Sequence, residues 1–213
     1  MATASLTKFT VPLATNQSAS NQGLLMPKLK YRFRVIFENF GVSTGTEQVE
    51  LTKQVSDISR PNLNFNPFVI EAYNSKVNLV GKPSWEPVTV NLRDDAGGNI
   101  SKLVGEQIQK QFDFAEQASA SSGIDYKFSL KFEILDGYNG TSPKGGKGND
   151  GVLETWTLLG AFLTSVNYGE MNYGTSEPAM ITLSVTYDNA LQTPTGTGIG
   201  SAVGRTLGTV ITG

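Results

Sequence analysis

The sequence contains neither cysteine nor histidine among its 213 residues. The absence of cysteine excludes disulfides, thiolate nucleophiles and Cys-ligated metal sites. The absence of histidine removes the commonest general base and the commonest metal ligand of proteins. We therefore expect no catalytic residues, no bound metal and no cofactor, and we expect the protein not to be an enzyme.

Clustered positive charge is also missing. The chain carries 17 Lys and Arg against 19 Asp and Glu, a net charge of −2. A strong hold on nucleic-acid phosphates needs clustered basic side chains. Lys30, Arg32 and Arg34 alternate along one segment, which is more typical of a solvated or partner-facing strand edge than of a phosphate site.

Long apolar runs are absent as well. No segment approaches the ~20 apolar residues that a membrane-spanning helix needs. The N-terminal segment lacks a basic start followed by an apolar stretch, so it does not resemble a secretory signal. We expect no membrane anchor, and we expect the protein to be made in a cytoplasm and to stay there until it assembles.

The sequence does show repeated alternation of apolar and polar residues, which is typical of half-buried strands. About seven strands are expected, and turn residues separate them. Two of them should form a hairpin closed by Asn74 and Ser75. This spacing predicts a mainly β fold of two packed antiparallel sheets, as a sandwich or a barrel. The strand segments are residues 29–37, 49–55, 68–72, 77–79, 88–92, 126–134, 152–159 and 179–187.

One segment has helical spacing instead. Ile100, Val104 and Ile108 recur at intervals of four residues, which predicts one helix at about 99–117, flanking the sheets. The expected organisation is an N-terminal arm (1–27), a β domain (28–191) with a glycine-rich insert (137–151), and a C-terminal arm (192–213). A weak apolar seam in the C-terminal arm is expected to dock on a neighbouring subunit, and it consists of Leu207, Val210 and Ile211.

Three segments partly resemble phosphate-binding, catalytic or calcium-binding motifs, but each lacks the residues or the spacing that its motif requires. The glycine-rich stretch 140–148 lacks the hydroxyl residue and the following helix of a phosphate-binding loop. Asp94 and Asp95 are adjacent in a turn, so a role in entering the helix is favoured over a catalytic carboxylate pair. The acidic and amide residues at 136–150 match no known calcium-loop spacing.

The order of these features resembles a known family. KYRFRVIF is followed by a long loop, by VNLVGKPSWEPVTVNLRDDAG and by an amphipathic helix. DYKFSLKFEIL, LLGAFLTSVNYG and AMITLSVTYDNA come next. Over roughly residues 29–190 this order resembles the tail tube proteins of T4-like contractile-tailed bacteriophages. The resemblance implies a turn in the glycine-aromatic segment LLGAFLTSVNYG, before the closing strand. Leu163 departs from the family pattern, in which proline is frequent at that place.

The resemblance implies a structural subunit of a phage tail tube. Six copies would form a ring whose sheets join edge to edge, and stacked rings would conduct double-stranded DNA during infection. The implied partners are further copies, the tail sheath protein, and baseplate and tail terminator proteins, in a virion tail assembled in the host cytoplasm. We expect a neutral or acidic channel wall, because such a wall does not hold phosphates.

The long polar segment 54–67 and the hairpin tip are expected to reach the next ring. The residues expected to make this contact are Ile58, Leu63, Phe65, Asn74 and Lys76. Two alternative tubes remain open, those of type VI secretion systems and of extracellular contractile injection systems. A carbohydrate-binding β-sandwich module is an alternative of another class, and a hydrolase that uses carboxylates alone is the least favoured.

Overall fold

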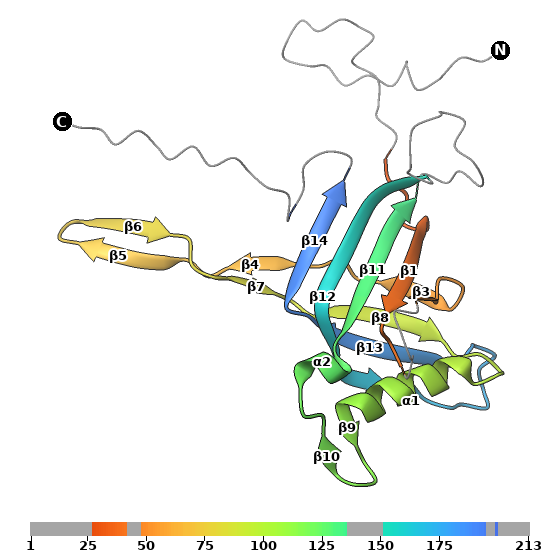
Figure 1. Cartoon of the computed structure of the whole chain (residues 1–213). Helices are drawn as coiled ribbons and strands as arrows, with labels where there is room; N and C mark the ends of the chain where they lie inside the picture. The colour runs from red at the N-terminus through yellow and green to blue at the C-terminus, as the bar shows by residue number, and fades with distance from the viewer. Residues whose placement is uncertain (1–26, 42–47, 136–150, 195–198, 200–213) are drawn as a thin grey trace, which may run out of the picture. The chain divides into compact units, whose positions relative to one another are not determined.

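The computed structural model describes residues 27–41, 48–135, 151–194 and 199 (Figure 1). The chain divides into two compact units, residues 1–32 and 33–213. In the first unit, the backbone N–H of Arg32 donates to the carbonyl of Leu29 at 3.2 Å, so these residues form a turn. The helices and strands of the described residues all lie in the second unit.

Eight antiparallel strands form one continuous sheet that β12 (Val152–Asn167) folds into two halves. Sheet 1 contains, in spatial order, β2 (Gln48–Glu50), β1 (Phe33–Glu38), β11 (Phe128–Leu135), the first part of β12, and β14 (Asn189–Pro194). Sheet 2 contains the second part of β12, β13 (Met180–Thr186), β8 (Val88–Arg93) and β3 (Val55–Ile58).

A glycine allows β12 to belong to both sheets. Gly160 has a φ of 65°, and a Cβ placed on it would lie 2.2 Å from Oδ2 of Asp188. Only glycine adopts this left-handed backbone without strain and without that collision. Residues before the bend pair with β11 and β14, and residues from Phe162 onward pair with β13.

The two sheets share one apolar core. Val35 and Phe37 of β1 and Leu130 of β11 are buried together with Val90 of β8 and Leu183 of β13. Polar residues alternate with these along each strand, so each sheet buries one face. The predicted mainly β fold of packed antiparallel sheets is confirmed.

The helix α1 (Asn99–Gln111) flanks these sheets, burying Ile100 and Val104 in the core. Asp95 accepts the backbone N–H of Ile100 at 3.1 Å, so the expected role of the acidic pair in helix entry is confirmed. This hydrogen bond is the largest of the influences that hold the pKa of Asp95 below its ordinary value.

The helix ends six residues earlier than predicted. The carboxylate of Asp113 accepts the backbone N–H groups of Ala115 and Glu116 at 2.9 and 3.2 Å, which turns the chain back on itself. The strands β9 (Phe112–Asp113) and β10 (Ala118–Ser119) pair across this turn. A short second helix, α2 (Gly123–Tyr126), which we did not predict, follows with a capping box between Ser122 and Asp125.

Four strand boundaries also differ from the sequence prediction. The first strand begins at Phe33, because the residues before it form a turn. The segment 49–55 divides between β2 and β3, which lie in different sheets. The expected turn at 159–169 is instead the bent interior and end of β12. Residues 192–194, predicted to begin the C-terminal arm, complete β14.

Candidate functional site

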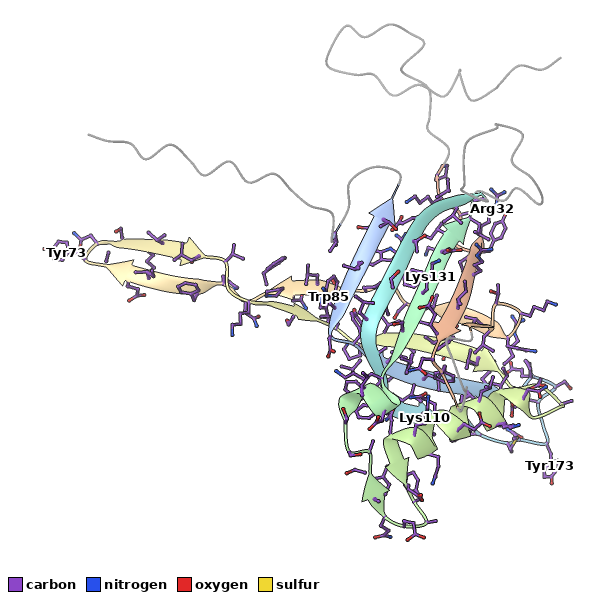
Figure 2. All side chains as sticks on the ribbon, in the orientation of Figure 1. Arg32, Tyr73, Trp85, Lys110, Lys131 and Tyr173 are labelled. Carbon is purple, nitrogen blue, oxygen red and sulfur yellow. The ribbon has the colours of Figure 1, made fainter. Side chains whose placement is uncertain are left out.

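An exposed two-stranded ribbon is the most distinctive surface of the second unit. It consists of β5 (Phe68–Ala72) and β6 (Ser75–Leu79), which pair with each other and with no further strand among the described residues. It continues from β4 (Leu63–Phe65) and β7 (Pro83–Trp85), and every residue of β5 and β6 is exposed. Figures 1 and 2 show the ribbon beyond β4 and β7, with Tyr73 at its tip and Trp85 at its base.

The ribbon is amphipathic. On one face, Ile70 lies opposite Val77 and Phe68 lies opposite Leu79. Ile70 is 49% exposed and Val77 is 51% exposed, so half of each side chain still contacts water. On the other face, Lys76 Nζ lies 3.2 Å from Glu71 Oε1, and both of these side chains are 72% exposed.

An isolated two-stranded hairpin is at best marginally stable in water. Contiguous exposed apolar surface on a folded protein commonly marks a contact site for another molecule. The apolar face of the ribbon therefore qualifies as a docking surface.

Polar contacts fix the base of the ribbon. Glu86 accepts the side-chain amides of Asn62 and Asn64 at 2.7 and 2.6 Å, which joins the two strands that lead to it. Trp85 packs on Tyr187, with ring centroids 5.9 Å apart, and this attaches β7 to the core. A Cβ on Gly81 would lie 2.0 Å from the carbonyl oxygen of Asn66, so only glycine permits the strands to approach here.

A buried carboxylate connects this base to sheet 1. Glu154 is almost fully buried and accepts the indole N–H of Trp156 at 2.5 Å and the amide of Gln192 at 2.7 Å. Arg60, which lies just before β4, reaches the same carboxylate at 3.4 Å. A buried carboxylate needs such partners, since an unpaired one is strongly destabilising.

The structure gathers only some of the predicted contact residues on the exposed surface. Phe65 is about half exposed at the end of β4, while Asn74 and Lys76 lie in the ribbon and its loop. Leu63 is half-buried opposite Trp85. Ile58 ends β3 and packs against the protein's own core. The predicted docking seam Leu207, Val210 and Ile211 lies outside the described residues, as does most of the predicted insert.

The sequence analysis predicted the hairpin of the ribbon but did not name its exposed apolar cross-strand pairs among the expected contact residues. The hairpin was predicted, although its loop is Tyr73 and Asn74, one residue earlier than expected. Phe68, Ile70 and Val77 were interpreted only as strand residues. The sequence signal for their exposure was that no later segment has a pattern that would clearly bury them.

The described part of the chain contains no group of three or more His, Cys, Asp or Glu side chains able to hold a metal ion. None of the helices in that part has the length and apolar character needed to cross a membrane.

No protein-family model matches the sequence, and no curated protein matches it. Solved structures do resemble the fold. A chain in the cryo-EM structure of the anti-feeding prophage tube-terminating cap has a TM-score of 0.57 and 15% identity, covering 84% of this chain and 99% of its own length.

Two further chains come from an extracellular contractile injection system. A chain of the sheath/tube terminator in the extended state has a TM-score of 0.54 and 14% identity, covering 80% of this chain and 99% of its own length. A chain of the extended sheath–tube complex has a TM-score of 0.51 and 13% identity, covering 84% of this chain and 99% of its own length. This chain thus has a fold found in the tube, cap and terminator assemblies of contractile injection systems, which is the fold group that the sequence resemblance indicated.

Proposed function

We propose that the protein is a structural subunit that assembles with copies of itself into a tube and catalyses no reaction. The observation that carries the proposal is the fold, which matches 99% of the length of chains from a tube-terminating cap and from a sheath–tube complex. The exposed ribbon supports it independently, since its apolar face is suited to contact with another protein.

The proposed assembly is a ring of six copies, stacked into the tail tube of a contractile bacteriophage whose channel conducts double-stranded DNA. A matching chain from the anti-feeding prophage baseplate, described as 6-fold symmetrised, supports the ring size. The proposed partners beyond other copies are a tail sheath protein, a baseplate and a tail terminator. The proposed location is the virion tail, assembled in the host cytoplasm.

Within this assembly the ribbon docks on a copy in the next ring. A head-to-tail contact of this kind does not close on itself, so it propagates along a tube. Phe65, Asn74 and Lys76 take part in the contact, and Leu63 and Ile58 support its base. The segment with Leu207, Val210 and Ile211 docks on a neighbouring subunit.

Negative-stain electron microscopy across a protein concentration series tests the proposal. Rings or hollow tubes of uniform width are the expected result. A dispersed monomer at every concentration, also after addition of a matching baseplate, would overturn it. Glycan binding by that monomer would favour the carbohydrate-binding module instead.

The same experiment does not separate a phage tube from the tube of a secretion or injection system. The neighbouring genes do, because a phage tail is encoded beside a portal and a terminase. A secretion ATPase among the neighbours would instead favour a tube that carries proteins.

A further inference from the structure

A side chain closes one edge of sheet 2. The backbone N–H of Leu163 donates to Oε1 of Gln111 at 2.8 Å, and Nε2 of Gln111 donates to the carbonyl of Leu163 at 2.9 Å. Leu163 lies opposite Val185 of β13, so these two backbone groups point to the other side of β12. The amide of Gln111 makes the same pair of hydrogen bonds that a neighbouring strand would make.

This closure is built into the core. Gln111 is the last residue of α1, which buries Ile100 and Val104 under the sheets. A strand added at this edge of β12 would have to displace both hydrogen bonds of Gln111 and the end of α1 that carries it. Sheet 2 is therefore closed at this edge in the free subunit.

The edges of sheet 1 are closed less firmly. On the outer side of β14, the backbone N–H of Ala190 donates to the side chain of Asn189 at 2.9 Å, and that of Gln192 donates to the carbonyl of Ile199 at 2.8 Å. Asn189 and Ile199 are both exposed, so a competing strand can displace them. At the opposite edge, β1 and the short β2 carry no further strand among the residues that the structure describes. Sheet 1 is thus the sheet that copies can extend on both sides.

The face of sheet 1 turned away from the core carries a compact charge cluster. Glu133 of β11 lies opposite Arg34 of β1 and opposite Thr155 of β12. Its carboxylate pairs with the guanidinium of Arg34 on one side and with Nζ of Lys131 at 2.9 Å on the other. Both basic side chains of this cluster are therefore bound to one carboxylate, whose side chain is only 5% exposed.

The protonation state of Glu133 suits this role. Burial alone raises the pKa of the carboxyl, but hydrogen bonds from Lys131 and Arg34 and their positive charges outweigh burial and hold the pKa below its ordinary value. The group is therefore ionised at neutral pH, and it cancels one of the two positive charges directly beside it. Glu38 of β1, and Glu50 of β2 opposite Ile36, occupy alternating positions of the same face, so two further acidic residues offset its remaining positive charge.

We infer that this face of sheet 1 lines the channel of the proposed tube, and that Glu133 neutralises its basic side chains so that a polyanion passes without being held. The inference rests on the proposed function, in which sheets of neighbouring copies join edge to edge. Sheet 2 and α1 pack on the other face of sheet 1, across the shared core, and a closed barrel has more room for them outside than inside. Unpaired cations on the wall would retain phosphates, so pairing them suits a nucleic acid in transit.

Cysteine labelling tests which face lines the channel, because the sequence contains no cysteine. Thr157→Cys places a thiol on the proposed wall, and Thr89→Cys places one on the outer face of β8. In free subunits both are expected to react with a small maleimide and with a maleimide on a bulky polymer. In tubes, Thr157→Cys should lose reaction with the bulky reagent alone, while Thr89→Cys keeps both.

Equal reaction of the two thiols with the bulky reagent in tubes would overturn the wall assignment and leave the proposed function standing. A failure of the unmodified protein to form any tube would instead refute the proposed function.

The role of Glu133 is tested by the retention of a fluorescent DNA duplex in tubes separated from free DNA. Tubes of Glu133→Gln should retain duplex at low salt and release it as salt rises, while unmodified tubes retain none. Glu116→Gln is the matched control, since it makes the same charge change on an exposed residue of the β9–β10 turn. Thr157→Lys, compared with Thr89→Lys, adds a further cation to the wall, opposite Lys131 of β11 and Leu191 of β14.

The inference would be overturned if the unmodified tubes retained duplex, or if neither Glu133→Gln nor Thr157→Lys tubes retained any. Passage of proteins in place of DNA is then the interpretation that remains for the channel.

Discussion

The apolar face of the ribbon supplies the most direct test of assembly. Ile70→Ser combined with Val77→Ser removes the central cross-strand apolar pair of that face. Complete burial of such a side chain is worth about 1.5–3 kcal/mol. Because these two are 49% and 51% exposed in the subunit, roughly half of that remains available to a partner, or about 1 kcal/mol for each.

The double variant should therefore weaken assembly by about 2 kcal/mol per copy, which is roughly a 30-fold rise in the concentration at which tubes appear. Pelleting of assembled protein across a dilution series measures that concentration. The unfolding transition of the free subunit should change little, because surface substitutions usually alter stability by about 0.5 kcal/mol or less.

A matched control lies on the opposite face of the same two strands. Glu71→Ser combined with Lys76→Ser removes an ion pair in which both side chains are 72% exposed, and such surface pairs contribute little. Lys76 is one of the proposed contact residues, but an exposed charge at the rim of an interface adds little to affinity, so this variant should raise the assembly concentration much less than the apolar one. If the two double variants assemble equally well, the ribbon's apolar face is not a contact surface and the reasoning from its exposure is wrong.

Three further predictions concern other parts of the second unit. Gly160→Ala should lower the free energy of unfolding in urea by about 2 kcal/mol or more, since the new Cβ meets Asp188 at 2.2 Å and φ is 65°. Gly105→Ala in α1 should raise the free energy of unfolding by up to about 1 kcal/mol, because no described atom lies within 4 Å of the new Cβ. Stabilisation by Gly160→Ala together with destabilisation by Gly105→Ala would contradict both predictions. Burial, followed by the charge of Glu86, raises the pKa of Tyr187 to about 12, so stability should fall as pH rises from about 10, where the unfolded tyrosine ionises, to about 12. Thermal unfolding of Tyr187→Phe should lack this loss, and at neutral pH the change should not destabilise, since the buried hydroxyl has no hydrogen-bond partner among the residues that the structure describes. Asn189→Ala should lower the concentration at which tubes form in pelleting assays, because it frees the backbone N–H of Ala190, and an unchanged or higher value would argue against β14 as the joining edge.

The sequence predicted those elements whose pattern is local. Alternation in 88–92 and 179–187 corresponds to β8 and β13, and the spacing from Ile100 onward corresponds to the start of α1. In each of these the burial of alternate or every fourth residue is set by neighbours in the same element. A short window of sequence therefore contains the necessary information.

Elements that depend on distant pairing were predicted less well. The segment 49–55 reads as one strand, yet its two ends join β1 and β8, which lie in different sheets. The family resemblance implied a turn at Gly160 and Phe162, but both flanks of this glycine pair with other strands and the strand continues through it. The end of α1 depends on the Asp113 side chain accepting two backbone N–H groups, which no helical period reveals.

The exposed hairpin was predicted in position, but the exposure of its apolar face was not. Alternation identifies which side of a strand is apolar, but it does not show whether the same chain covers that side. Ile58 was therefore chosen as a contact residue although it packs on its own core, while Ile70 was not chosen although nothing in the described chain buries it. Only the arrangement of the folded chain separates these two cases.

The chemistry of the ribbon also bears on what covers it. A sugar ligand presents hydroxyl groups, and each hydroxyl removed from water needs a hydrogen-bond partner to offset its desolvation. The central pair of Ile70 and Val77 offers none, and neither does Phe68 beside it on the same face. A protein surface can supply matching apolar side chains, and the cores of protein interfaces are more apolar than the surface around them. The apolar pairs thus favour contact with another protein over a carbohydrate, and the exposed ion pair of Glu71 and Lys76 keeps the opposite face compatible with water.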